Sequence, residues 1–295
     1  MAELIVVGLI LGSIIALGAI GLTLIYGILK FANFAHGDLM TAGAYIAFLT
    51  FYGGGHIGPL SFGFGMIPAI LAAMIVVGLL SVVIDRLVYR PLRQRNANLV
   101  ILAMASLGMA IIVRSLVYLG WGPDQRFYVV GIQKALQLPF GVTLKPDQIF
   151  IGCTALVVVG LVYLLLYRTK LGRAMRATAD NMELARVAGI DTERVIMWTW
   201  AIGGGLAGLA GVLLGIQSHL MPELGFIFLL PLFAAAILGG VGSPHGALIG
   251  ALIVGISQEV STEWISPAYK PAVAFLLLFA ILLIRPRGLF GVKAL

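Results

Sequence analysis

Two short polar stretches interrupt the apolar runs of this chain, and each places a histidine directly before a glycine. The first is FANFAHGDLMTAGAYIA, residues 31–47, and the second is ILGGVGSPHGALIGALIVG, residues 237–255. Inside a membrane, the backbone leaves helical geometry only where protein or a water-filled cavity satisfies its polar groups. We therefore predict broken or re-entrant segments at both stretches, bordering a path through the molecule.

Anion binding is the chemistry that these stretches offer. The N-terminus of a helix presents free N–H groups and the positive end of the helix dipole, which suit a carboxylate. The predicted path-lining residues are Asn33, His36, Gly37, Asp38, Gly242, Ser243, His245 and Gly246. Structural readings stay open for the same residues: each histidine could bond a neighbouring carbonyl, Asp38 could favour a helix N-terminus, and Asn33 could cap one.

The composition places these stretches in a membrane. Of 295 residues, 61% are hydrophobic and 11% are charged, with a mean hydropathy of +1.08, whereas soluble domains carry about 25% charged residues. We predict an all-α integral membrane protein with one transmembrane domain over residues 1–295. The net charge of +7 comes from clusters between apolar runs, so lipid rather than nucleic acid is the expected partner. Cys153, the single cysteine, is expected to be a small buried hydrophobe, and no metal site is predicted.

The apolar windows predict about eight or nine membrane crossings, since a spanning helix needs about 20 apolar residues. Six windows are clear: 4–29, 67–84, 99–119, 149–167, 195–217 and 271–284. Three are short or carry polar residues, glycine or proline: 35–52, 226–241 and 247–264. Eight crossings would require one of these weak segments to re-enter the membrane instead of spanning it.

Three basic clusters predict which ends of the helices face the cytoplasm, because short cytoplasmic loops carry the excess of Lys and Arg. The clusters are Arg86, Arg90, Arg93 and Arg95; Arg168, Lys170, Arg173, Arg176, Arg186 and Arg194; and Arg285, Arg287 and Lys293. The loop at 120–148 has balanced charge and the interfacial aromatics Trp121 and Tyr128, as expected of an outer face. Nine crossings, with the N-terminus outside and the C-terminus in the cytoplasm, satisfy every cluster.

The charged segment 168–194, RTKLGRAMRATADNMELARVAGIDTER, is the longest polar break between apolar runs. Residues 173–190 have a helical rhythm, and Gly189 stands where a helix end needs a left-handed residue, with Ile190 as the accompanying hydrophobic contact. Asp191 or Thr192 can cap the next helix. We predict a short helix, a sharp turn and re-entry into the membrane, forming a docking element for a soluble cytoplasmic partner.

Glycines recur at four-residue spacing in two of the apolar windows. One series is Gly242, Gly246 and Gly250, and the other combines Ala207 with Gly211 and Gly215. Such spacing puts small residues on one face of a helix and lets two backbones approach closely. We therefore predict a tightly packed bundle.

Several motifs, in order along the chain, resemble one family. The run LGRAMRATADNMELARVAGIDTERVI, followed by GGGLAGLAGVLLG and AAILGGVGSPHGALIGALIVG, resembles the permease subunits of ABC importers for branched-chain amino acids, the Liv family, and in particular the H-type subunit. GLTLIYGILKFANFAHGDLMTAGAYIA and IRPRGLFG are similar to the same family, so the resemblance covers nearly the whole chain. It implies a bacterial inner-membrane permease that forms half of an amino-acid pore and is not an enzyme.

The resemblance also implies partners. They are a second homologous permease subunit, two cytoplasmic ATPase subunits, and a periplasmic or lipid-anchored substrate-binding protein. ATP and magnesium belong to the ATPases, and this chain is expected to bind no cofactor. In such importers a cytoplasmic loop with a degenerate E-A-A-x-x-x-G signature fits the ATPase; Glu183, Ala185 and Gly189 match it here, with Leu184 in place of an alanine. The predicted docking residues are Arg173, Glu183, Ala185, Gly189 and Ile190.

Two other classes of membrane protein compete with this interpretation. The sequence has no G-x-x-x-x-G-K-[ST] phosphate loop, so the energy for transport has to come from a partner. An ion-coupled secondary transporter is the main alternative, with relays drawn from His36, Asp38, His219, Glu223, Glu259 and Glu263. A membrane enzyme is disfavoured because Ser243 and His245 lack a third catalytic partner. The sequence leaves open the solute (leucine, isoleucine and valine, other amino acids, urea or amides) and whether the permease pairs with itself or a homologue.

Overall fold

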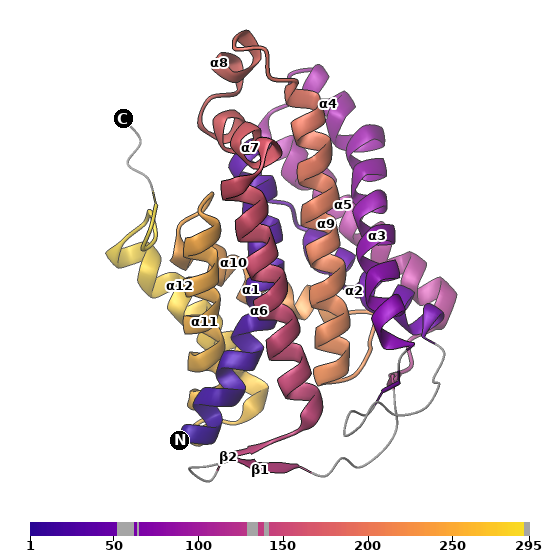
Figure 1. Ribbon diagram of the computed structural model, residues 1–295, viewed down its shortest axis with the longest axis vertical. Coiled ribbons are helices and arrows are strands. Elements are labelled where there is room, and N and C mark those ends of the chain that lie inside the picture. The colour runs from indigo at the N-terminus through magenta and orange to yellow at the C-terminus, as the bar shows by residue number, and fades with distance from the viewer. Residues whose placement is uncertain (52–61, 64, 129–134, 139–141, 292–295) are drawn as a thin grey trace.

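The computed structural model describes residues 1–51, 62–63, 65–128, 135–138 and 142–291, and it forms an elongated helical bundle (Figure 1). The helices are α1 (Ala2–Leu29), α2 (Ala35–Thr50), α3 (Met66–Ile84), α4 (Arg90–Gln94), α5 (Leu99–Trp121), α6 (Pro146–Arg168), α7 (Lys170–Asp180), α8 (Met182–Val187), α9 (Thr192–Gln217), α10 (Leu224–Gly239), α11 (Pro244–Val260) and α12 (Lys270–Ile284). A short antiparallel pair, β1 (Leu136–Leu138) and β2 (Val142–Leu144), lies near the N-terminus of the chain in Figure 1. The predicted all-α membrane class is confirmed, while the hairpin was not expected.

Six of the described helices are long and apolar enough to cross a membrane, and they coincide with the six clear windows of the sequence. The three weak windows are also helices, but α2, α10 and α11 are only 16, 16 and 17 residues long. Residue 52, the predicted end of the first weak window, lies outside the described residues. The number of complete crossings stays a prediction.

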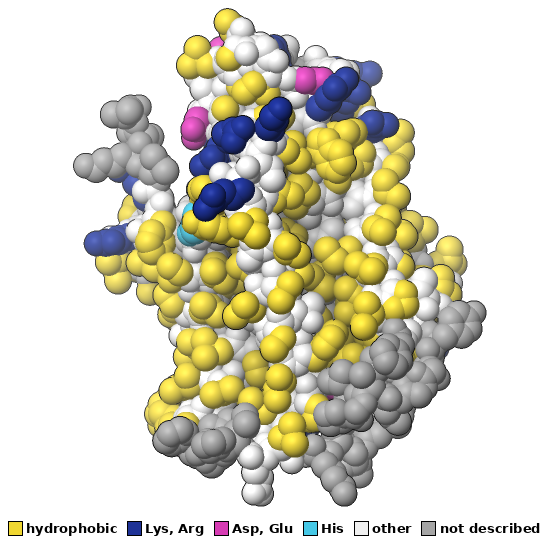
Figure 2. Space-filling model, viewed as in Figure 1, with side chains coloured by type: hydrophobic (Ala, Val, Ile, Leu, Met, Phe, Trp, Pro, Cys, Tyr) yellow, Lys and Arg dark blue, Asp and Glu magenta, His cyan; other side chains and the backbone are white. Residues whose placement is uncertain are grey.

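Burial separates a central pair of helices from the periphery. In the apolar windows of α1 and α9, 67% and 83% of the residues are buried, against 22% for α6 and 6% for α12. Helices α1 and α11 pack antiparallel, because Gly27 faces Gly242 at one end of the pair and Gly8 faces Ile256 at the other. The exposed apolar residues of the outer helices form a yellow band across the face shown in Figure 2, as expected of a surface in lipid.

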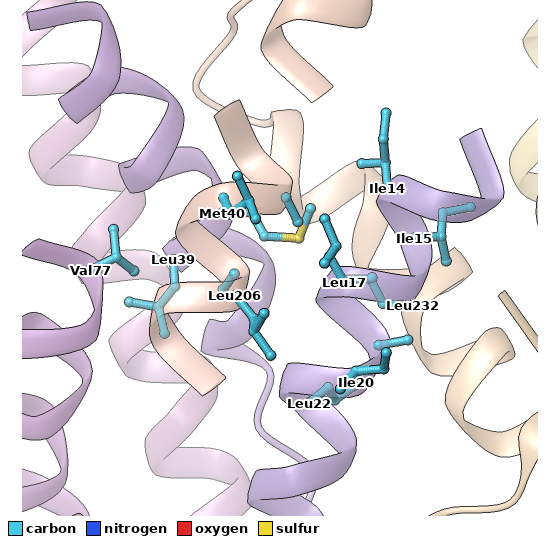
Figure 3. Packing of buried hydrophobic residues seen from close by; sticks show 14 of the residues in the cluster. Ile14, Ile15, Leu17, Ile20, Leu22, Leu39, Met40, Val77, Leu206 and Leu232 are labelled. Carbon is cyan, nitrogen blue, oxygen red and sulfur yellow. The ribbon is translucent and has the colours of Figure 1, made fainter. Parts of the chain in front are cut away.

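The close packing predicted from the glycines is confirmed. A Cβ built on Gly211 would lie 1.8 Å from the Met40 carbonyl oxygen, and one on Gly246 would lie 2.1 Å from the Gly239 carbonyl oxygen. Figure 3 shows the apolar core at this level, where Leu17 of α1, Met40 of α2 and Leu232 of α10 converge. Helix backbones in contact leave no room for larger side chains at these positions.

The ends of the bundle differ in charge. Helix α3 continues through a π-helical turn, Asp85–Tyr89, into α4, so the first arginine cluster lies on a helical extension. Helices α7 and α8 share this end of the molecule, and the N-terminus lies at the other (Figure 1). The segment after α12 returns to the basic end, since the Leu289 N–H donates to the Leu238 carbonyl at 2.8 Å. Lys293 lies outside the described residues.

One local expectation was wrong. Cys153 is exposed on α6 and is not a buried hydrophobe. Since α6 is a peripheral helix, an apolar run there faces outward on much of its circumference. The hydropathy of a membrane helix cannot separate core from lipid-facing positions, because both are apolar.

Candidate functional site

The chain breaks between α1 and α2 and turns back into the bundle before α2 begins. Helix α1 ends at Lys30, which has the left-handed φ of 59°. His36, in the first turn of α2, lies with its Nε2 2.9 Å from the Gly18 carbonyl oxygen. Measured along the helix axis, Gly18 lies about 16 Å before the end of α1. The break predicted within residues 31–47 is therefore present, and α2 starts deep inside the molecule.

Polar side chains satisfy the backbone of this break. The Phe34 N–H donates to the Ser106 hydroxyl of α5 at 2.9 Å, and that hydroxyl lies 3.3 Å from the Ala32 carbonyl oxygen. The Asn33 Oδ1 accepts from the N–H of Ala35, the first residue of α2, at 3.2 Å, although the N-cap position of α2 is occupied by Phe34. Non-helical backbone is tolerated at this depth because protein groups supply the missing hydrogen bonds.

An ion pair stands at the N-terminus of α2. The Arg114 Nε of α5 donates to the Asp38 Oδ1 at 2.8 Å, and its Nη2 donates to the Oδ2 at 3.1 Å. The Asp38 side chain is fully buried, whereas that of Arg114 is 20% exposed. Two parallel charge-assisted bonds hold the guanidinium in one orientation. Because Arg114 sits in the middle of an apolar helix, the pair is a functional candidate by its position alone.

The N-termini of α2 and α10 meet beside this ion pair. A Cβ on Gly37 would lie 2.3 Å from the Gly225 carbonyl oxygen, and one on Gly225 would lie 1.7 Å from that of Gly37. The Thr41 hydroxyl accepts from the Gly225 N–H at 2.9 Å, which satisfies one free N–H group in the first turn of α10. Two helix dipoles therefore point their positive ends into one region.

Arg114 extends from this junction toward the surface between α5 and α10. Its guanidinium carbon lies 4.2 Å from the centroid of the Phe226 ring, and that side chain belongs to an exposed residue. Glu223, the residue before α10, adds a second carboxylate that interacts electrostatically with Arg114. A partly exposed cation next to two acids can exchange partners with a solute that carries a carboxylate and an ammonium group. The geometry thus fits a zwitterion.

The second predicted segment lies elsewhere. Gly240 and Gly242, with φ of 106° and 89°, form the turn between α10 and α11, and Gly242 faces Gly27 near the basic end. Ser243 caps α11, since its hydroxyl accepts from the Gly246 N–H at 3.2 Å. The structure does not bring the two His-Gly pairs together. The path-lining role of Gly242, Ser243, His245 and Gly246 stays a prediction.

His36 and His245 have different surroundings. His36 is completely buried between helices, and its Nδ1 has no hydrogen-bond partner among the described residues. His245 is exposed at the first turn of α11, where its Nδ1 lies 3.1 Å from the Tyr167 hydroxyl. The reading of a histidine bonded to a neighbouring carbonyl is confirmed for His36, whereas His245 lies against a tyrosine hydroxyl instead.

The predicted docking segment is two helices and not one. Asn181 has an extended backbone that ends α7 and caps α8, accepting from the Leu184 N–H at 2.9 Å. The spacing of apolar residues in the sequence did not reveal this break. A single asparagine can stand on the polar face of one long helix or cap a new helix, and the spacing does not distinguish the two. The prediction for Gly189 is confirmed: its φ is 84°, and the Ile190 N–H donates to the Ala185 carbonyl at 3.0 Å. Asp191 caps α9 through the Arg194 N–H at 3.1 Å.

Helix α8 lies at the outermost tip of the basic end (Figure 1), and it carries exposed apolar side chains. Leu184 is 67% exposed and Val187 is 86% exposed. Of the predicted docking residues, Arg173, Glu183 and Gly189 are exposed, Ile190 is half-buried and Ala185 is buried. The exposed apolar pair was missed from the sequence, where Leu184 counted only as a departure from a motif.

A comparison with known proteins assigns these features to a family. A family model described as the permease component of branched-chain amino acid transport systems matches residues 4–282. The chain belongs to this permease family.

Two relatives of the permease show how far the similarity extends. BraD of Pseudomonas aeruginosa, a high-affinity branched-chain amino acid transport system permease protein, is 36% identical over 293 residues, or 96% of this chain and 94% of the relative. LivH of Escherichia coli strain K12, described in the same terms, is 35% identical over 294 residues, which cover 96% and 93% of the two chains. The family resemblance seen in the sequence is confirmed.

A lysine of this permease joins the break at α2 to α7. The Lys30 ammonium donates to the Ala179 carbonyl oxygen in the last turn of α7 at 3.1 Å. The C-terminal carbonyls of a helix carry partial negative charge, so a cation there is favourable.

Sequence analysis missed Lys30, Ser106 and Arg114. A lone arginine in the middle of a 23-residue apolar helix was the available signal for Arg114.

Proposed function

We propose that this permease forms one half of the translocation pathway of an ATP-driven importer for branched-chain amino acids. A second permease subunit completes the pathway, and a substrate-binding protein outside the bacterial inner membrane delivers the solute. The match of residues 4–282 to the family model carries this proposal. The names of BraD and LivH, which describe branched-chain amino acid transport permeases, support the choice of solute.

The pathway runs along the face between α5 and α10. Arg114 lies at this face, where the α2 and α10 N-termini meet, while Asp38, Asn33 and His36 are buried behind it. A second subunit covers this face and encloses the pair. The solute carboxylate is attracted to Arg114 and the ammonium group to Asp38, so neither charge crosses the bilayer unpaired.

The energy for transport enters through α8. Leu184 and Val187 dock on a cytoplasmic ATPase, which supplies ATP and magnesium, and the basic end therefore faces the cytoplasm with the N-terminus outside. When the ATPases close, α7 and α8 move together and Lys30 transmits the motion to the start of α2. This movement converts an outward-open pathway into an inward-open one.

Leucine uptake into proteoliposomes tests the proposal. The purified permease, its partner permease and the ATPases are reconstituted with ATP enclosed and the binding protein outside. We expect uptake that requires ATP, survives collapse of proton and sodium gradients, and is inhibited by isoleucine and valine more than by glutamate or urea. Uptake that continues without nucleotide and stops with an uncoupler would support the secondary transporter instead.

A further inference from the structure

A continuous groove runs along the outside of the bundle between α1, α6 and α11. Its lower part has a volume of about 420 Å³ and is lined by apolar residues such as Leu9, Leu156 and Leu252. The next hollow toward the basic end shares Val159 and Leu248 with it. A third hollow shares Leu166, Tyr167 and Pro244 with the second, so the three adjoin one another; the second and third are shallow, with volumes of about 30 and 50 Å³.

The floor of the groove offers little to a polar ligand. Ser13 is the one hydroxyl residue that lines its lower part, and that hydroxyl donates to the Ile10 carbonyl of its own helix at 2.7 Å. Gly152 opens the wall on α6, since a Cβ there would meet only the Ile10 side chain, at 4.0 Å. The lower groove therefore fits a flexible hydrocarbon chain.

The upper end of the groove is cationic. Arg176 of α7 lines it, and its guanidinium carbon lies 4.6 Å from the centroid of the Tyr167 ring. Within the described part of the chain, no carboxylate lies within ion-pair distance of Arg168, Lys170, Arg173 or Arg176. Figure 2 shows Lys and Arg side chains gathered directly above the apolar band on this face, with a histidine at the border. None of the described residues that line this end of the groove is acidic.

The groove is longer than one leaflet of a bilayer. Its lining residues on α1 run from Ile28 at the upper end to Val6 at the lower end, which is about 33 Å at the helical rise and close to the full hydrocarbon core of roughly 30 Å. A chain attached to a headgroup at Arg176 would occupy the upper part of the groove and reach the level of Ser13, about 15 Å along α1 from Thr23. The basic end is also the end expected in the cytoplasm, where a leaflet rich in anionic lipid faces basic segments.

We propose that this groove binds an anionic phospholipid of the leaflet next to α7. One acyl chain lies between α1, α6 and α11. The headgroup phosphate pairs with Arg176, whose guanidinium lies over the Tyr167 ring. Among the described residues, the four cations at this end have no carboxylate within ion-pair distance. An anionic headgroup therefore binds here in preference to a zwitterionic one. Because α7 leads directly into α8, the bound lipid stabilises the position of the first helix of the docking element.

Native mass spectrometry of the assembled transporter tests this site. Phosphatidylglycerol and phosphatidylcholine with identical acyl chains are added at equal concentration to the complex in detergent. The wild type is expected to retain phosphatidylglycerol preferentially. The variant Arg176→Gln should lower that preference about fivefold, the effect of losing one cation near a charged headgroup, whereas Arg95→Gln, an exposed cation at the same end, should not change it.

A second pair of variants locates the acyl chain. Gly152→Phe fills the groove and should reduce retention of both lipids, while Gly160→Phe, on the same helix with nothing within 4 Å of its Cβ position, should not. Equal retention of the two lipids by the wild type overturns the proposal, as does a Gly152→Phe complex that binds as much lipid as Gly160→Phe. A photocrosslinker at Leu156 that captures the partner permease and not lipid also overturns it.

Discussion

At the scale of single residues, the ion pair of Asp38 and Arg114 joins a fully buried carboxylate to a guanidinium that is only 20% exposed. Both lie within apolar helices, and each depends on the other for compensation. Removing one partner of such a pair leaves a buried charge and costs about 3–5 kcal/mol, while removing both can be nearly neutral. The pair is therefore open to a test that separates stability from transport.

We expect Arg114→Gln to destabilise the permease and Asp38→Asn combined with Arg114→Gln to recover most of that loss, because the double variant buries no charge. Thermal unfolding of the assembled complex in detergent measures this recovery. Leucine uptake should stay low in the double variant, since neither charge is left for the zwitterion. A double variant that transports normally would show that the pair only holds the helices together.

The sequence predicted many residue-scale features of the docking segment and few of the path. Gly189 and Asp191 could be assigned because helix ends have local rules that the sequence displays. The partner of Asp38 could not, because Arg114 lies 76 residues away and is brought close only by the packing of α2 on α5. Pairing across helices is a property of the fold, not of a motif.

At the scale of elements, glycine contacts fix how α2 crosses α10. The Gly225 position leaves no space for a methyl group, because the Gly37 carbonyl oxygen would be 1.7 Å away. Gly108 of α5 has nothing within 4 Å of its Cβ position. The two glycines therefore make a matched pair for testing which helix contacts hold the junction.

Gly225→Ala is expected to separate α2 from α10 and to lower both the yield of assembled complex and its unfolding temperature. Gly108→Ala should raise stability by about 0.5–1 kcal/mol, because alanine favours the helical backbone over glycine. Unfolding temperatures of the two variants, measured on the complex in the same detergent, check both directions. Equal behaviour of the two variants would contradict the backbone contact.

Lys30 offers a test of the link between α7 and α2. Lys30→Met keeps a non-glycine residue at the left-handed φ of 59°, so the change removes the ammonium and its bond to Ala179 but adds no backbone strain. We expect ATP hydrolysis to continue while leucine uptake falls several-fold, and Lys30→Arg should restore part of the uptake. The number of ATP molecules hydrolysed per leucine transported is the readout; an unchanged ratio would remove Lys30 from the coupling route.

Element boundaries were accessible from the sequence because hydropathy and helix caps are local. The weak windows at 35–52, 226–241 and 247–264 correspond to α2, α10 and α11, which are 16, 16 and 17 residues long. The split of the docking segment at Asn181 and the strands β1 and β2 depend on contacts beyond the local pattern, and the sequence did not indicate them.

At the scale of the whole molecule, the two ends of the bundle face opposite sides of the membrane. Helix α8 and the basic clusters lie at one end, and Glu3 lies at the other (Figure 1). In a variant with Cys153 replaced by serine, a membrane-impermeant maleimide added to right-side-out cells should label a cysteine at Glu3 and leave one at Glu183 unlabelled. Labelling of Glu183→Cys from outside would reverse the orientation.

Helix α8 is the proposed point where ATP-derived motion enters the permease. The most direct measurement is ATP-dependent leucine uptake by a Leu184→Asp, Val187→Asp variant in proteoliposomes, beside Leu136→Asp, a 43% exposed apolar residue at the opposite end. We predict uptake at background for the α8 variant, with both permease subunits still assembled, and normal uptake for Leu136→Asp. Normal ATP-dependent uptake by the α8 variant would contradict the account.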